Sequence, residues 1–147
     1  MPPADLPLHV VLDASVAVRW IVDEVGSAEA AALLEKDIAW IAPRLLLTEV
    51  ASALRRKVAD GALDAASAAQ SLDALLQAVG DGIIRLVEDE RIVAQALLLA
   101  LALGHKLPDC VYLALAEREG AAIATADDRL IRLARSRRIE VVTVPHG

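Results

Sequence analysis

The chain has 147 residues, of which 56% are hydrophobic and 24% are charged, and its formal net charge is −6. This length allows one full hydrophobic core without disulfides, and the apolar content excludes a disordered chain. Aromatic residues make up only 2%, namely Trp20, Trp40 and Tyr112, which disfavours a platform for stacking bases. The negative charge also disfavours a broadly basic nucleic-acid surface.

The sequence predicts a cytoplasmic protein without a membrane segment. Its single cysteine, Cys110, cannot form an internal disulfide, which fits a reducing compartment. The first ten residues lack the basic and apolar regions of a signal peptide. The longest uncharged apolar run, residues 92–104, is shorter than the ~20 residues of a membrane helix.

Short apolar runs typical of strands alternate along the chain with longer helical segments. In chain order, the pattern predicts a strand at 9–12, helices at 15–21 and 27–36, a strand at 39–42, helices at 45–60 and 64–79, a strand at 83–87, helices at 92–103 and 108–119, a strand at 122–125, a helix at 128–136 and a strand at 140–144. Ser27 is expected as an N-cap, and the segment 92–103, apolar nearly all round, as a buried helix.

Strands that alternate with helices indicate parallel strands joined by right-handed crossovers. The predicted fold class is therefore α/β: one three-layer domain over residues 1–147, with a roughly five-stranded parallel sheet flanked by helices. In such open sheets, ligands bind beyond the carboxyl ends of the strands, where the strand order reverses. The residues that directly follow each strand are therefore the first candidates for a functional site.

Four acidic residues stand at positions that suit such a site. Asp13 follows the first strand and Asp127 follows the fourth, so they face one crevice if these two strands are neighbours. Glu49 and Asp109 lie in otherwise apolar helical segments. Converging carboxylates suit a hard cation such as Mg²⁺ or Mn²⁺, and the sequence holds no comparable cluster of His and Cys.

Each of these acidic residues also has a purely structural explanation. Asp13 and Asp127 are at positions where carboxylates cap helices, and Asp109 can favour a helix N-terminus through the helix dipole. Glu49 can lie on the solvated face of its helix. For any one of these residues, a structural role is about as good an explanation as metal binding. Four such residues together favour a metal site.

Four segments, in this order, resemble the PIN-domain ribonucleases, and most closely the VapC toxins of bacterial toxin–antitoxin pairs. They are residues 11–16 (VLDASV), 48–54 (TEVASAL), 108–116 (PDCVYLALA) and 124–130 (ATADDRL). The resemblance covers essentially the whole chain. It implies a PIN-like, Rossmann-like domain that acts as a metal-dependent endoribonuclease, hydrolysing RNA phosphodiester bonds as the toxin of such a pair.

The resemblance also implies the site and the partners. Asp13, Glu49, Asp109 and Asp127 would form the catalytic site and hold Mg²⁺, with Mn²⁺ as an alternative, and Ser15 and Thr125 would be supporting polar residues. The partners implied are a homodimer mate and a small VapB-type antitoxin whose C-terminal segment covers the acidic groove.

The chain departs from the family pattern at two positions. Cys110 stands where the family usually has a small residue such as Ala, and Asp128 adds a second carboxylate beside Asp127. The spacing from Thr125 favours Asp127 as the ligand. In an extended chain Asp127 points to the same side as Thr125, whereas Asp128 points to the opposite side.

Basic residues are grouped near two of the acidic segments. Arg55 and Arg56 follow Glu49, and Arg56 returns to the Glu49 face of the helix, so both are candidates for contact with RNA phosphates or for an ion pair in the site. Five arginines crowd the helix after Asp127: Arg129, Arg132, Arg135, Arg137 and Arg138. For the last two we favour a solvated face. No groove-reading motif is present, which favours single-stranded or looped RNA.

Other functions fit the sequence less well. Neither a P-loop nor a G-x-G-x-x-G motif is present, and Ser15 stands where haloacid-dehalogenase-type phosphatases have a second Asp. Cys110 with His105 nearby suggests a nucleophile, but a Cys in an apolar helix is usually buried as a small hydrophobe. The main alternative is a catalytically idle PIN scaffold that binds RNA or a partner protein. The four filled acidic positions argue against it.

Overall fold

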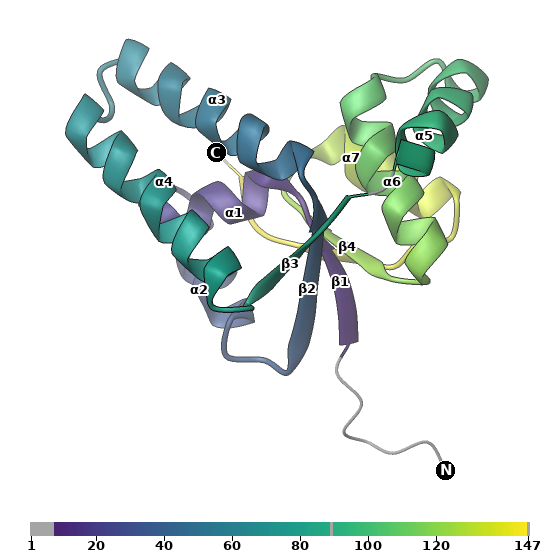
Figure 1. Cartoon of the computed structure of the whole chain (residues 1–147), viewed down its shortest axis with the longest axis horizontal. Helices are drawn as coiled ribbons and strands as arrows, with labels where there is room; N and C mark the ends of the chain where they lie inside the picture. Colours follow the sequence, from purple (N-terminus) through teal and green to yellow (C-terminus); the bar gives the residue numbers. More distant parts are fainter. Residues whose placement is uncertain (1–7, 89, 147) are drawn as a thin grey trace.

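A five-stranded sheet forms the centre of the computed structural model, which describes residues 8–88 and 90–146 (Figure 1). The strands are β1 (Leu8–Leu12), β2 (Ile38–Pro43), β3 (Ile84–Val87), β4 (Ala122–Thr125) and β5 (Val141–Thr143). All pairs are parallel, in the order β3-β2-β1-β4-β5. The predicted α/β fold class is therefore confirmed. Residues 1–7, part of the segment for which no signal peptide is expected, lie outside the described residues.

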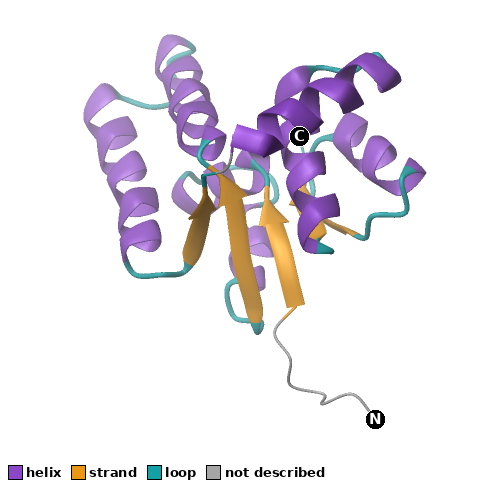
Figure 2. Cartoon of the chain, turned by 45° about the vertical axis from the view of Figure 1, so that its right-hand side comes forward, coloured by secondary structure: helices purple, strands orange, loops and turns teal. Residues whose placement is uncertain are grey.

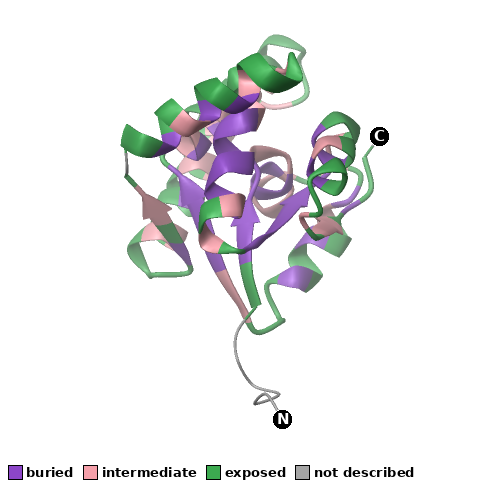
Figure 3. Ribbon diagram, turned by 90° about the vertical axis from the view of Figure 1, so that its right-hand side faces the viewer, coloured by how far each residue is buried: buried purple, intermediate pink, exposed green. Residues whose placement is uncertain are grey.

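Seven helices in the described chain cover the two faces of the sheet (Figures 1 and 2). One face carries α1 (Ala14–Ile21), α2 (Ser27–Leu33), α3 (Leu45–Ala59) and α4 (Ala65–Gly80), and the other carries α5 (Glu90–Leu103), α6 (Leu107–Glu119) and α7 (Asp128–Ser136). Because successive side chains of a strand point to opposite faces, Val10 and Leu12 pack into the first core and Val11 into the second. The central strands are buried on both sides (Figure 3).

The start of α2 differs from the prediction. Its N-cap is Gly26, not Ser27, and the hydroxyl of Ser27 instead donates to the carbonyl of Val22. Gly26 has a φ of 89°, and a Cβ there would lie 2.1 Å from the carbonyl oxygen of Pro145. Glycine is therefore required, because both the conformation and the close approach of the C-terminal segment exclude a side chain.

The expectation that the fifth helix is buried is wrong. In α5 only Ile92, Ala96 and Leu99 are buried, whereas Leu98 and Leu101 are 68% and 72% exposed. The reason is the layer in which the helix lies: α6 packs directly on β1, β2 and β4, and α5 packs on α6. Apolar composition was therefore a good indicator for α6, in which Cys110 through Ala116 are all buried, and a poor one for α5.

Within the described part of the chain, no single helix is long and apolar enough to cross a membrane. The helices α5 and α6 meet the length and composition criteria only as a pair, and the chain bends by 115° between them. Since α6 is part of the second core, burial in the domain accounts for its apolar composition.

The strand order places two chain segments side by side at the carboxyl edge of the sheet. β1 pairs with β2 on one side and with β4 on the other, so the order reverses between β1 and β4. Leu12 is in register with Ala124, and the amide of Asp13 donates to the carbonyl of Ala124 over 3.1 Å. Asp13 and Thr125 therefore meet at the switch point, where open parallel sheets bind ligands.

Candidate active site

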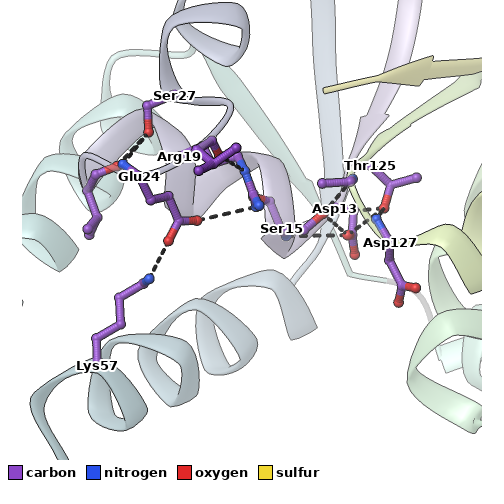
Figure 4. Close-up of polar contacts among 11 residues, drawn as sticks. Asp13, Ser15, Arg19, Glu24, Ser27, Lys57, Thr125 and Asp127 are labelled. Carbon is purple, nitrogen blue, oxygen red and sulfur yellow. Dashed lines mark hydrogen bonds and ion pairs between the residues drawn. The ribbon is translucent and has the colours of Figure 1, made fainter. Parts of the chain in front are cut away.

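Asp13 is the most buried carboxylate of the predicted set, with 7% of its surface exposed. Its Oδ2 accepts hydrogen bonds from the amide of Ser15 (3.3 Å), from the Ser15 hydroxyl (2.5 Å) and from the Thr125 hydroxyl (2.9 Å; Figure 4). Asp13 is thus the N-cap of α1, as its structural explanation proposes. Its Oδ1, however, accepts no hydrogen bond from a described residue, so the cap uses only half of the carboxylate.

Two polar side chains connect the ends of β1 and β4. The fully buried Thr125 hydroxyl donates to Asp13 and accepts a hydrogen bond from the amide of Asp127 over 3.0 Å. The Ser15 hydroxyl accepts from the amide of Ala126 over 2.9 Å. Asp13 is therefore held rigidly by neighbours from both strand ends, which pre-orients its carboxylate.

The other three acidic residues reach the same pocket from three different helices. Glu49 comes from α3, Asp109 from the first turn of α6, and Asp127 from the N-cap of α7. All four acidic residues line one pocket, together with Ser15 and Arg56. The fold therefore brings together residues that are up to 114 positions apart in the sequence.

Each aspartate of this cluster has one oxygen in a hydrogen bond and one that accepts none from a described residue. Oδ2 of Asp109 lies 2.8 Å from Nε2 of His105, and Oδ1 of Asp127 accepts from the amide of Arg129 over 2.9 Å. In residues 8–88 and 90–146, no three His, Cys, Asp or Glu side chains are already arranged as ligands of one ion. The uncommitted oxygens nevertheless fit a hard divalent cation, because such ions take carboxylate oxygens and water as ligands.

Burial is the largest electrostatic effect on Asp13 and Glu49, and the charges of neighbouring carboxylates add to it. Burial raises the pKa of Asp13, the hydrogen bonds from Ser15 and Thr125 oppose the rise, and the charge of Asp109 adds to it. Burial also raises the pKa of Glu49, with the charges of Asp13 and Asp109 adding to the effect. A bound divalent cation would reverse both effects, since it favours the ionised form of every carboxylate around it.

Tyr112 is a buried neighbour of the site that the sequence analysis did not identify; it does not line the pocket. Its side chain is fully buried, and its hydroxyl makes no hydrogen bond to a described residue. The hydroxyl lies near Glu49 without the distance and angle of a full hydrogen bond, and as a nearby dipole it lowers the pKa of that carboxyl. Burial raises the pKa of Tyr112 itself. Its position three residues after Asp109, on the same helix face, is a signal that could have revealed it.

The two neighbouring aspartates after β4 point to different surroundings. Asp127 lines the pocket, whereas Asp128 does not; the Asp128 side chain is exposed and its Oδ2 lies 3.1 Å from Nε2 of His146. The geometry therefore associates Asp127 with the other acidic residues, as the spacing from Thr125 predicts.

The cations on the α3 side of the pocket only partly match the prediction. Arg56 lines the pocket and lowers the pKa of Glu49, whereas Arg55 is exposed and is not among the lining residues. Arg19 and Lys57, which the sequence analysis did not single out, also line it, and both form ion pairs with Glu24 (Figure 4). Nη1 of Arg19 lies 3.3 Å from Oε1 of Glu24.

Comparison with protein families identifies the domain. The chain matches the model of the PIN domain over residues 10–136, and it belongs to the PIN domain family. PIN domains are generally nucleases. The fold and the position of the acidic cluster at the switch point of the sheet agree with this membership.

Solved structures with the same fold come from several organisms. The structure of PAE2754 from Pyrobaculum aerophilum has a TM-score of 0.69 and 19% identity, over 95% of this chain and 93% of that one. A toxin–antitoxin complex from Klebsiella pneumoniae has a TM-score of 0.65 and 15% identity, over 91% of this chain and 96% of the other. VapBC2 from Rickettsia felis, bound to a DNA fragment of its promoter, has a TM-score of 0.64 and 13% identity, over 93% and 99%. A comparison with curated proteins gave no match.

Proposed function

We propose that this protein is a metal-dependent endoribonuclease that hydrolyses RNA phosphodiester bonds and acts as the toxin of a toxin–antitoxin pair. One observation carries the proposal: four carboxylates from four parts of the chain line a single pocket at the switch point of the sheet. Membership of the PIN domain family supports the nuclease class.

The residues of the pocket suit metal-assisted hydrolysis. Asp13, Asp109 and Asp127, with Glu49, would hold Mg²⁺ or Mn²⁺, and a divalent ion there would offset phosphate charge and lower the pKa of a bound water. Ser15 and Thr125 fix the direction of the Asp13 carboxylate.

Two residues on the α3 side of the pocket would also act on the attacking water and the substrate. Glu49 would position a water bound to the ion that it helps to hold. Arg56 supplies positive charge beside Glu49 for a phosphate next to the scissile bond.

The partners follow from the same proposal. We expect a single-stranded or looped RNA substrate in the cytoplasm, and the fold shared with chains of toxin–antitoxin complexes supports an antitoxin partner whose C-terminal segment covers the acidic groove. We also expect a homodimer whose interface is formed by α5, because the dimer would cover the exposed apolar side chains of that helix, among them Leu98 and Leu101. Light scattering of a Leu98→Glu, Leu101→Glu variant should then give a monomer where the parent chain gives a dimer, and an unchanged mass would contradict this interface.

The function is tested with chelator-treated protein and a pool of structured RNAs. Cleavage should appear on addition of Mg²⁺ or Mn²⁺, disappear with EDTA, and be absent in an Asp13→Asn variant. Single-stranded DNA of the same sequences tests the preference for RNA. Binding of the RNA pool with no cleavage under any metal would favour the catalytically idle scaffold instead.

The toxin role is tested by expression in cells. The parent chain should arrest growth, and the Asp13→Asn variant should not.

A further inference from the structure

A group of basic residues lies beside the acidic cluster, on the side opposite α3. His105 and Lys106, from the segment between α5 and α6, form a surface pocket with Arg129 and Arg132 of α7, together with Gly104 and Leu133. We refer to these six residues as the α7 patch. None of them lines the acidic pocket itself.

The α7 patch is joined to the acidic cluster through two contacts. His105 lies within hydrogen-bond distance of Asp109, and the amide of Arg129 donates to Asp127. The α7 patch is therefore in direct contact with two of the four carboxylates, Asp109 and Asp127. A chain that passes over the acidic pocket on this side meets the α7 patch next.

The cations of the α7 patch are not neutralised by the fold. Lys106, Arg129 and Arg132 are exposed, and none of them forms an ion pair with a carboxylate in residues 8–88 or 90–146. Other cations of the same chain are paired: Arg137, just after α7, binds Glu117, and Lys57 binds Glu24. In a chain with a net charge of −6, three adjacent unpaired cations have no structural role that these contacts explain.

We propose that the α7 patch binds backbone phosphates of a single-stranded nucleic acid whose scissile bond lies at the acidic cluster. The proposal rests on the nuclease function proposed above and extends it by naming a path for the substrate. Arg129 and Arg132 lie three residues apart on α7, so both side chains lie on one face of the helix. Arginine binds phosphate through a planar fork of donors, and lysine binds it as a point charge.

Repulsion between the acidic cluster and the phosphates of the strand makes a separate phosphate-binding site necessary. Four carboxylates repel the strand that they are to cleave, and a divalent ion offsets this charge only at the scissile phosphate. The α7 patch, at one border of the cluster, supplies attraction for the next phosphates. Arg56 supplies it at the border with α3.

The proposal is tested by the binding of a fluorescein-labelled 12-residue oligouridylate in EDTA, measured by fluorescence anisotropy over a range of salt concentrations. The test variant is Arg129→Gln, Arg132→Gln. The matched control is Lys36→Gln, Arg85→Gln, which removes the same charge from exposed residues that line a different pocket and belong to neither α7 nor the patch.

Each phosphate contact to a single strand contributes ~0.7 to the slope of the logarithm of the binding constant against the logarithm of the salt concentration. Loss of two contacts in the test variant should therefore reduce the slope by about 1.4. The affinity at 0.1 M salt should fall about 25-fold. The control should change the affinity less than about twofold if its cations face solvent. Equal losses for both variants, no loss for the test variant, or no binding by the parent chain would overturn the proposal.

Two further results separate the possible explanations. If a 12-residue polyglutamate displaces the oligouridylate at lower concentration than unlabelled oligouridylate does, the patch takes an acidic peptide and the proposal is overturned. Metal-dependent cleavage is measured separately on the same preparations. Selective loss of binding in a protein that cleaves nothing would support the α7 patch and refute the nuclease function, whereas cleavage with unchanged binding would refute only the patch.

Discussion

Cations border the acidic cluster on two sides, and the two groups differ in whether a carboxylate of the chain pairs with them. On the α3 side, Arg19 and Lys57 are both bound to Glu24. In the α7 patch, Arg129 and Arg132 have no carboxylate partner in the described chain. The number of basic residues near a site therefore does not measure its attraction for a polyanion; what counts is the charge left after internal ion pairing.

The largest effect is expected from the carboxylates between the two sides. Asp127→Ala should abolish metal-dependent cleavage and lose ~1 kcal/mol of stability, the typical value of a lost cap, because Asp127 is the N-cap of α7. Asp128→Ala should keep most of the cleavage and lose at most ~1 kcal/mol, since it removes only an exposed contact with His146. The reason is that Asp127 lines the pocket while Asp128 contacts His146. Cleavage assays and thermal melts of both variants check this. An inactive Asp128→Ala beside an active Asp127→Ala would show that the assignment is wrong.

Glu24→Gln should make the α3 side more like the α7 patch. It releases Lys57 from its ion pair, so the affinity for oligouridylate at 0.1 M salt should rise by up to about fivefold, the contribution of one phosphate contact. Arg19 stays bound to the carbonyls of Ser15 and Val25. Glu29→Gln is the matched control, because Glu29 is an exposed residue of α2. A rise of the same size in both variants would mean that only the net charge matters.

Tyr112→Phe tests the polar support of the cluster without touching either cationic side. The substitution removes a buried hydroxyl that has no hydrogen-bond partner in the described chain, so stability should change by less than about 1 kcal/mol. Because the hydroxyl lowers the pKa of Glu49, its loss should raise that pKa further in metal-free protein, which an NMR titration of the Glu49 carboxyl measures. An unchanged pKa of Glu49 would show that Tyr112 only fills space.

The smallest effect concerns stability and pH in the absence of metal. The folded-state pKa of Asp13 is raised, so its ionised form opposes folding, and this cost disappears as the pH falls through that pKa. Asn can still accept the hydrogen bonds of Ser15 and Thr125. Asp13→Asn should therefore melt above the parent chain at pH 7 in EDTA, with a difference that shrinks toward pH 4. A variant that melts well below the parent at both values would favour a purely structural cap.

The sequence predicted the architecture because strand and helix patterns in this chain are regular and uninterrupted. It also predicted that Asp13 and Asp127 would face one crevice if their strands were neighbours, and in the structure β1 and β4 are neighbours and both residues line one pocket. It failed for α5, because apolar composition does not tell which of two apolar helices lies against the sheet.

Sequence spacing also says little about contacts between distant segments. The pairing of Glu24 with Lys57 spans 33 residues, and nothing in either segment indicates it. The closeness of Tyr112 to Glu49 joins residues of α6 and α3, two helices that lie on opposite faces of the sheet. Such contacts decide which charges remain available, so the functional surface could not be read from composition.

The most direct test measures metal binding and RNA cleavage on the same protein. Mn²⁺ is titrated into chelator-treated parent chain and into Asp13→Asn by calorimetry, and RNA cleavage is followed at the same Mn²⁺ concentrations. The account predicts that cleavage rises in parallel with Mn²⁺ binding in the parent chain, and that Asp13→Asn, still folded, loses both. Full cleavage by rigorously metal-free protein, or Mn²⁺ binding that is unchanged in Asp13→Asn, would contradict it.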